Sequence, residues 1–469
     1  MSETIGEMIL PGTYIDVRAE GLIGVGGIST GNVGIVGTAN RGPVDEVRIL
    51  GSYGEALDTF GAYDSYTSGT AITPGAPALT LVRALEQLFA GGASSVFAVR
   101  IGDFGVGTPP STTWSITFVD SAVDNELFKL TARTPGTWAN DIQVTCVKSG
   151  GVATLQLKYG RFKEEFVAAT AGALATAVNA GSALVSANAP VPAEVAMVPD
   201  KATITNATSN GAAFTNIQIT TGLGKLANQP VNIVVVAGAT TANLAPIQAH
   251  LEATENDGKE RLAVLGAASD DPQTIGSPVS NARILVTAPG IVADDAADSR
   301  AVTLPASYTA ALIAGRLASL APHVSLTNKD VPVAEVSKEY TRAEQKVLLG
   351  NRILALKKDL GIRVLKGITT DTGAFKQISV RRIVDYAKAG VRVGSNPYIG
   401  KLNNARVRAA LQATLDGFLS GMVLDEMLTA YTLQVSATRQ QEINGIALVT
   451  MTLQPTFSID FVKVIMNLE

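Results

Sequence analysis

The sequence predicts an α/β fold with several domains: an α/β core, a β-rich inserted outer domain, and an α+β C-terminal domain joined by the N-terminal arm. Short apolar runs typical of buried strands alternate with amphipathic helix patterns on both sides of residues 102–224. Those intervening residues are instead rich in Thr, Ala, Ser and Gly and carry short alternating runs. At 469 residues the chain is long enough for about two to four domains.

These shifts in composition place the domain borders. Within the intervening stretch, residues 114–119 and 154–157 alternate apolar and polar side chains with the period of a strand. The predicted domains are residues 1–20 (N-terminal arm), 21–101 plus 225–335 (core), 102–224 (inserted domain), 336–455 (C-terminal assembly domain) and 456–469 (C-terminal strand arm).

The core begins with an apolar run at residues 33–39, which predicts a short buried strand ended by an Arg-Gly-Pro sequence. Residues 79–90 repeat leucine at helical spacing before a Gly-Gly pair, which predicts an amphipathic helix. A strand pattern at residues 95–101 completes a strand–helix–strand unit, typical of parallel pairing. Similar patterns predict strands at 231–236, 262–265 and 284–288 and helices at 242–252 and 312–320.

In the C-terminal domain, Thr341 predicts the start of a long helix, because Glu344 three residues later completes a capping box. An apolar stripe from Leu349 to Leu360 predicts that this helix continues to Gly361. Further helices are predicted at 378–389 and 403–422, and strands at 362–365, 443–453 and 457–466. In the first of these helices, Arg381, Arg382 and Lys388 are expected to point partly outward.

Both ends of the chain carry strand patterns without an obvious hairpin partner. Residues 9–18 alternate after a Pro-Gly pair, and residues 457–461 alternate before an apolar run at 462–466. Strands attached in this way to a compact body suit β-strand addition between subunits, and pairing within the own domain is the alternative. The residues predicted to enter neighbouring subunits are Tyr14, Ile15, Val17, Phe457, Ile459, Phe461, Val462, Val464 and Ile465.

Composition and charge favour a protein that meets charged protein partners. Only 17% of residues are charged and the mean hydropathy is +0.24, which indicates large domains or a surface buried again in an assembly. Residues 338–408 hold sixteen Lys or Arg against five Asp or Glu, although the whole chain carries −4. Such asymmetry indicates a charged partner for one surface.

Little in the sequence suggests catalysis or a cofactor. The single Cys146 excludes an intrachain disulfide and a thiol metal cluster. The only histidines, His250 and His323, are too few to favour a catalytic triad or a zinc site. Ser29 occupies the third glycine position of a dinucleotide-binding pattern. The acids at 294–298 are interpreted as a solvated loop rather than a cation site. We therefore expect no enzyme, no cofactor and no metal.

The sequence also predicts neither secretion nor membrane insertion. Residues 1–10 lack the basic start and apolar core of a signal peptide. The longest stretch without charge, residues 166–193, is Ala-rich and interrupted by Gly, Asn, Ser and Pro. We therefore expect a protein made in the cytoplasm.

A series of short segments resembles one family, the contractile tail sheath proteins of bacteriophages and related particles. Each segment alone is weakly specific, and their number and order carry the resemblance, while most of the inserted domain lies outside it. The segments are PGTYI (11–15), GIVGTA (34–39), RGPV (41–44), FAGGA (89–93), VFAVR (96–100), PGTWAN (135–140), YTAALIAGR (308–316), SLTNK (325–329), GITT (367–370) and VRRIVDY (380–386).

The resemblance implies a structural, mechanical function. Subunits of this family stack as hexameric rings into a helical sleeve around a tail tube. The sleeve contracts when the baseplate triggers it and drives the tube through the target envelope. Their terminal arms reach into neighbouring subunits and complete a shared sheet. The implied partners are further copies of the chain, the tail tube, baseplate and tail terminator proteins. The implied location is the virion tail after assembly in the bacterial host cytoplasm.

For the basic block, the resemblance suggests contact with an acidic tube wall. The residues expected to face the tube are Arg381, Arg382, Lys388, Arg392 and Lys401. An ordinary solvated helix face is the simpler interpretation. A nucleic-acid-binding module is a further alternative, but it needs aromatic side chains among the cations, and residues 338–408 hold few. An α/β protein of other function is the last alternative.

Overall fold

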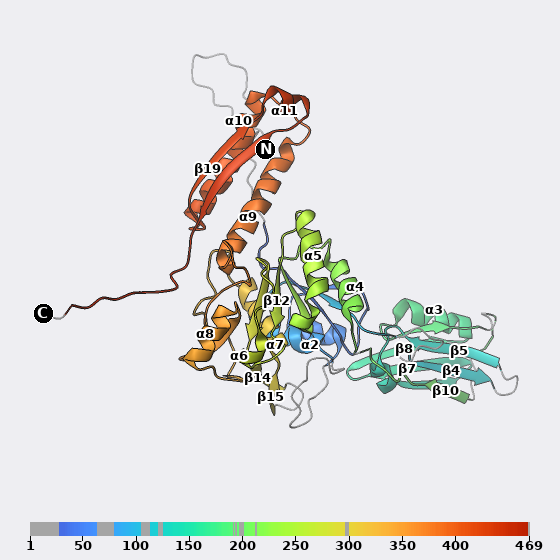
Figure 1. Ribbon diagram of the computed structural model, residues 1–469. Coiled ribbons are helices and arrows are strands. Elements are labelled where there is room, and N and C mark those ends of the chain that lie inside the picture. The colour runs from blue at the N-terminus through green and yellow to red at the C-terminus, as the bar shows by residue number, and fades with distance from the viewer. Residues whose placement is uncertain are drawn as a thin grey trace, which may run out of the picture. The chain divides into compact units, whose positions relative to one another are not determined.

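The computed structural model describes residues 28–62, 79–104, 113–120, 125–190, 192, 195–196, 201–211, 213–295 and 300–467. The predicted N-terminal arm, with Tyr14, Ile15 and Val17, lies outside these residues. The chain divides into two compact units (Figure 1). We call residues 31–320 and 328–371 the core unit, and residues 28–30, 321–327 and 372–467 the C-terminal unit.

The core unit is built on an eight-stranded sheet in the order β18-β17-β13-β12-β11-β1-β3-β2. From β3 to β17 all neighbours are parallel, and the outermost strands β2 and β18 are antiparallel. The predicted α/β core with parallel pairing is therefore confirmed. The strands are β1 Val33–Gly37, β2 Val47–Leu50, β3 Val96–Arg100, β11 Ile233–Thr240, β12 Leu262–Gly266, β13 Ile284–Ala288, β17 Leu354–Lys358 and β18 Ile362–Val364.

Helices cover both faces of this sheet (Figure 1). Along β1, Val36 joins an apolar cluster with α4 and α5, whereas Ile35 is buried outside that cluster. Helices α2 and α7 lie so close that a Cβ on Gly315 would be 2.0 Å from the carbonyl oxygen of Leu88. The helices of this unit are α1 Tyr53–Phe60, α2 Leu81–Ala90, α3 Ala171–Gly181, α4 Asn216–Leu226, α5 Leu244–Asn256, α6 Pro272–Ile275, α7 Ala306–Ala318 and α8 Arg342–Gly350.

The inserted domain is β-rich, as predicted, and has its own apolar core around Trp114, Phe128 and Trp138. Its sheets have the orders β10-β4-β5-β9 and β6-β7-β8, and α3 packs on them. The predicted border at residue 224 is wrong, because it falls inside α4, whose Ile219 and Leu223 pack in the core cluster. The strands are β4 Ser115–Asp120, β5 Asn125–Ala132, β6 Gln143–Ser149, β7 Val152–Tyr159, β8 Phe162–Ala168, β9 Val185–Asn188 and β10 Lys201–Thr205.

The predicted long helix after Thr341 is wrong in its second half. The capping box of Thr341 and Glu344 is present, but α8 ends at Gly350. Arg352 then adopts a positive φ of 62°, and the apolar residues that follow form β17. The apolar stripe therefore belongs to a helix and a buried strand in succession.

The acids at 294–295 were expected in a loop, but they end strand β14 (Ile291–Asp295), which pairs with β15 (Arg300–Leu304) and β16 (Glu335–Val336). No group of three or more His, Cys, Asp or Glu suited to a metal occurs among the described residues. In the same part of the chain, no helix combines the length and apolar character needed to cross a membrane.

The C-terminal unit contains a helical layer and a two-stranded β-ribbon. Both predicted helices are present, and α9 extends further than predicted. Strand β19 was not predicted, and the strand expected at 443–453 starts only at Leu448 because α11 precedes it. The elements are α9 Ile378–Ser395, the 3-10 turn η3 Asn396–Tyr398, α10 Ala405–Leu424, β19 Leu428–Ser436, α11 Arg439–Ile443 and β20 Leu448–Pro455.

Candidate assembly surface of the C-terminal unit

The ribbon of β19 and β20 is a sheet of only two strands. Val435 pairs with Val449 and Tyr431 with Leu453 in the antiparallel register. In the described part of the chain each strand has one strand neighbour, so the outer edge of each is without a strand partner. An isolated two-stranded ribbon is marginal in water, and open strand edges are templates for pairing with another chain.

The two faces of the ribbon differ. Tyr431, Leu433 and Leu453 pack against a cluster that includes Ile383 of α9 and Phe418 of α10. The opposite face is polar and exposed, with Thr432, Gln434, Thr450, Thr452 and Gln454. The helices therefore hold one face of the ribbon, while no further strand pairs with its edges in the part of the chain that the structure describes.

The residues after β20, which we call the C-terminal tail (456–467), form no strand within the subunit, so the strand expected at 457–466 is not present there. The tail is fixed at its root, since Thr456 N–H donates to the carbonyl oxygen of Met427. The Asp460 carboxylate accepts hydrogen bonds from Gln377 Nε2 at 3.2 Å and Thr327 Oγ1 at 3.5 Å. These contacts all lie within the C-terminal unit.

The tail turns its polar side chains inward and its apolar side chains outward. Ser458 and Asp460 are half-buried, whereas Phe457 is 63% and Ile459 and Phe461 are each 83% exposed. This is the reverse of the usual arrangement in a monomer, because burying one such apolar side chain stabilises the folded state by roughly 1.5–3 kcal/mol relative to leaving it exposed. The apolar side chains exposed beyond Phe461 are Val462, Val464, Ile465 and Met466.

Two of the predicted tube-facing arginines do not point outward. Arg381 and Arg382 are each 6% exposed, so the expectation that they lie partly at the surface is wrong. Arg381 forms an ion pair with Asp385 one turn later and stacks over the ring of Phe375 at 4.3 Å. The sequence pattern does not reveal this burial. Asp385 and Phe375 both lie within a few residues of Arg381, and the same local sequence fits a solvated helix equally well.

Arg382 is used to join segments distant in sequence. Its guanidinium donates to the carbonyl oxygens of Ala321 and Thr30, each at 3.2 Å. Burial lowers the pKa of Arg382 to about 10, so the group remains charged at neutral pH. Arg382 therefore fixes α9 to the other segments of the C-terminal unit.

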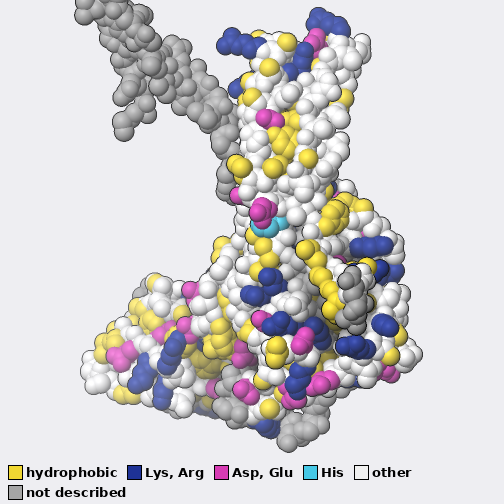
Figure 2. Space-filling model, turned by 90° about the vertical axis from the view of Figure 1, so that its left-hand side faces the viewer, with side chains coloured by type: hydrophobic (Ala, Val, Ile, Leu, Met, Phe, Trp, Pro, Cys, Tyr) yellow, Lys and Arg dark blue, Asp and Glu magenta, His cyan; other side chains and the backbone are white. Residues whose placement is uncertain are grey.

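The remaining predicted cations are exposed. Lys388 and Arg392 lie one turn apart on α9, and Lys401 follows η3 with its Nζ 4.9 Å from the centroid of the Tyr398 ring. Arg439 of α11 is also exposed, and its guanidinium pairs with Glu442. Figure 2 shows Lys and Arg side chains gathered at the end of the C-terminal unit that carries α11.

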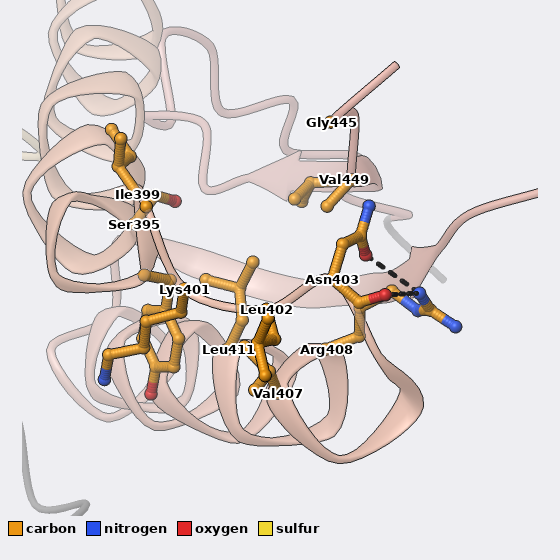
Figure 3. A pocket seen from close by; sticks show the side chains of 13 residues that line it. Ser395, Ile399, Lys401, Leu402, Asn403, Val407, Arg408, Leu411, Gly445 and Val449 are labelled. Atoms are coloured by element: carbon orange, nitrogen blue, oxygen red, sulfur yellow. Dashed lines mark hydrogen bonds between the residues drawn. The ribbon is translucent and has the colours of Figure 1, made fainter. Parts of the chain in front are cut away.

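A pocket lies between η3, the start of α10 and the start of β20 (Figure 3). Its volume is about 280 Å³. The apolar lining residues are Ile399, Leu402, Val407, Leu411, Ala447 and Val449. Sequence reasoning missed this pocket and β19. The alternation of Tyr431, Leu433 and Val435 is a signal that predicts β19, whereas nothing local predicts a pocket that three separate segments form.

The fold and this surface define a structural, assembling class of protein, and comparisons with known proteins identify the family. Residues 212–370 match the family model described as phage tail sheath protein central domain. Residues 370–469 match the one described as phage tail sheath C-terminal domain. Together these matches cover more than half of the chain, so the chain belongs to the phage tail sheath protein family. The resemblance found in the sequence is thereby confirmed.

Individual relatives agree with this assignment. The chain is 25% identical over 222 residues to the tail sheath protein of Bacillus phage SP01, a match that covers 45% of this chain and 39% of that protein. The chain thus spans about two fifths of the length of this relative.

Solved structures share the fold at low sequence identity. A sheath tail protein from Desulfitobacterium hafniense is 16% identical, with a TM-score of 0.65 over 95% of this chain and 100% of that one. A sheath tail protein from Listeria innocua is 15% identical, with a TM-score of 0.68 over 92% and 93%. The contracted helical sheath of the anti-feeding prophage is 14% identical, with a TM-score of 0.57 over 99% of both chains.

Proposed function

We propose that this chain is the subunit of a contractile tail sheath. It polymerises as stacked hexameric rings around a tail tube and contracts, when triggered at the baseplate, to drive the tube through the target envelope. The observation that carries the proposal is that one unit contains both an exposed apolar tail and a ribbon whose two outer edges have no strand partner among the described residues. A subunit with both features is incomplete alone and complementary to further copies of itself.

In the assembly, the terminal arms add to the ribbon of neighbouring subunits. An added strand pairs its backbone with the outer edge of β19 or β20, where no strand pairs among the described residues, and its apolar side chains leave water. The arm residues proposed for these contacts are Tyr14, Ile15, Val17, Phe457, Ile459, Phe461, Val462, Val464 and Ile465. A donated strand keeps its backbone bonds while the subunit bodies exchange contacts, so the lattice remains connected during contraction.

The energy for contraction is stored in the contacts between subunit bodies. Shifting a two-state equilibrium from 1:99 to 99:1 needs about 5.5 kcal/mol. If the six subunits of a ring change state together, a free-energy difference of about 1 kcal/mol per subunit between the extended and contracted states is sufficient. Many bistable contacts along a sleeve therefore add to a large driving force. No nucleotide is needed in this mechanism.

The basic surface is proposed to hold the tube. Lys388, Arg392 and Lys401 are exposed, and their charges suit an acidic tube wall. Exposed ion pairs contribute only about 0–1 kcal/mol each and are screened by salt, so this contact is weak per subunit and easily exchanged. Arg381 and Arg382 are excluded from this role, since both guanidinium groups bind within their own subunit. Their burial also weakens the case for nucleic-acid binding by the basic block.

Baseplate and tail terminator proteins are proposed to cap the two ends of the sleeve, where the outermost ring lacks a neighbour. The proposed location is the tail of a virion or of a related contractile particle, after assembly in the cytoplasm of the bacterial host. Electron microscopy of the purified full-length chain tests the function directly. We expect sleeves or stacked rings, and a stable monomer that binds DNA would contradict the proposal.

A further inference from the structure

We propose that the pocket beside β20 receives the ring of Phe461 from the tail of a second copy of the chain. This inference rests on the proposed strand donation and deepens it by naming where the donated tail is anchored. The tail that donates the ring and the pocket that accepts it both belong to the C-terminal unit, but they lie near opposite ends of α9.

The pocket has the size and lining for an aromatic ring. Its volume of about 280 Å³ exceeds the roughly 150 Å³ of an apolar cavity that holds benzene. Leu411 forms part of its buried lining, and Leu402 stands at the rim with 78% of its surface exposed (Figure 3). A ring seated there would remove both its own surface and that of Leu402 from water.

Hydrogen bonds keep the pocket walls in place before anything binds. On one side, the Tyr398 hydroxyl donates to the Ala410 carbonyl oxygen at 3.0 Å and lies 2.6 Å from Thr414 Oγ1. These bonds fix the turn after α9 against α10. A site held in shape in this way loses less entropy on binding than a flexible one.

The opposite wall is fixed by a charged network. Arg408 Nη1 donates to Asn403 Oδ1 at 2.8 Å and to Glu442 Oε1 at 2.9 Å. Asn403 Nδ2 donates in turn to the Ile446 carbonyl oxygen at 2.9 Å. The network joins the start of α10 to the loop before β20, and the charge of Arg408 is balanced beside the apolar lining.

The subunit's own tail does not reach this pocket. Asp460 is bound to Gln377, the residue that precedes α9, whereas the pocket begins at Ser395, the last residue of α9. A helix of 18 residues is about 27 Å long. Phe461 follows Asp460 directly and so lies within about 4 Å of it along the backbone. A Phe461 ring in this pocket therefore comes from another copy.

The pocket also adjoins the start of β20. Val449, on the face of β20 that packs against the helices, and Ala447, which directly precedes the strand, form part of its lining, so a tail paired with β20 of another copy runs close to the pocket. Strand addition gives affinity through the backbone and specificity through pockets for alternate side chains. Donor and acceptor lie at opposite ends of α9, so one copy can donate its tail to a second copy while it accepts the tail of a third, which is the head-to-tail arrangement of rings and helical polymers.

Disulfide trapping in assembled sleeves tests the anchor. Phe461→Cys and Leu402→Cys are made in separate Cys146→Ser chains and mixed, so that only contacts between copies are trapped. The control acceptor is Ile217→Cys on α4, since Ile217 is 76% exposed and matches Leu402. We expect crosslinked dimers with Leu402→Cys at a yield at least about tenfold above the control. Lys463→Cys is a second donor, which retains the phenylalanine ring.

A loss-of-contact variant gives an independent measure. Phe461→Ala should raise the concentration needed for assembly by roughly 10- to 100-fold, and Ile217→Ala should leave it unchanged. Sleeves that require the tail but give no crosslink from either donor would overturn the pocket anchor alone. Sleeves of normal length from a chain without its tail would overturn strand donation and the anchor together.

Discussion

Gly390 of α9 and Phe418 of α10 approach so closely that a Cβ on the glycine would lie 1.9 Å from Cζ of the phenylalanine. The ring is only 9% exposed and also lies 5.7 Å, between centroids, from the ring of Tyr386. The two helices therefore cross where only glycine fits. Because the ribbon packs on these helices, this crossing positions the edges that we propose to receive the donated strands.

Substituting Gly390→Ala should destabilise the C-terminal unit by about 1–3 kcal/mol, because the added methyl group displaces Phe418 from its packed position. Gly417→Ala is the matched control on α10, since no atom lies within 4 Å of its Cβ. That control should stabilise the helix by about 0.5–1 kcal/mol. Urea unfolding followed by circular dichroism gives both values, and equal midpoints for the two variants would disprove the close crossing.

The ion pair of Arg381 and Asp385 is buried, with side-chain exposures of 7% and 15%. Asp385→Ala should cost about 3–5 kcal/mol of unfolding free energy, because it leaves a buried guanidinium without its counter-charge. The exposed pair of Arg48 and Glu46 is the control, and Glu46→Ala should cost no more than about 1 kcal/mol. The double variant Arg381→Met with Asp385→Leu should recover most of the loss. A small effect of Asp385→Ala would mean that Arg381 is solvated.

His250 makes the stability of the core unit depend on pH. Its Nε2 lies 2.8 Å from Arg261 Nη1, and burial followed by the charge of Arg261 lowers its pKa from 6.5 to about 4. Between pH 4 and pH 6.5, His250 of the unfolded chain therefore binds more protons than His250 of the folded chain. The contribution of this histidine to the free energy of unfolding is complete above pH 6.5 and falls towards pH 4. The loss reaches about 3 kcal/mol at most.

Unfolding measured at pH 7 and pH 4.5 checks this dependence. His250→Gln retains an acceptor for Arg261 and does not titrate, so its unfolding midpoint should differ less between the two pH values. If the variant and the parent chain lose stability in parallel, other groups account for the pH dependence.

The proposed tube contact predicts a charge effect. Lys388→Glu combined with Arg392→Glu should weaken binding of the sheath subunit to purified tubes several-fold and reduce the salt dependence of binding. Lys201→Glu, an exposed lysine on the inserted domain, is the control and should have no effect. Co-sedimentation at 50 and 500 mM salt measures both; binding that salt does not weaken would remove the electrostatic contact.

Much of the fold follows from local patterns. The runs that became β1, β3, β11, β12 and β13 are largely apolar because helices cover both faces of the sheet, which is why the sequence predicts them well. The capping box at Thr341 is likewise a local signal with a local cause. The helix predicted beyond it failed, because Ile353 and Leu356 fit a buried strand and a helical stripe equally well.

The candidate assembly surface of the C-terminal unit was less predictable, because its contacts join residues far apart in sequence. Arg382 is buried by carbonyl oxygens of Ala321 and Thr30, which no pattern near residue 382 reveals. The alternation of Phe457, Ile459 and Phe461 identified the tail correctly as apolar on one side. It could not show that this side faces away from the subunit, since that orientation is set by Asp460 binding Gln377.

In the proposed assembly the tail acts outside its own subunit, and electron microscopy of a chain lacking residues 457–469 is the decisive test. The deletion begins after Thr456, so the hydrogen bond to Met427 and the whole ribbon remain. We predict a folded subunit with an unchanged circular dichroism spectrum that forms no sleeves, with or without tubes. Removal of residues 1–17 should have the same effect if that arm is also donated. Contractile sleeves of normal length from the chain without residues 457–469 would contradict tail donation between subunits.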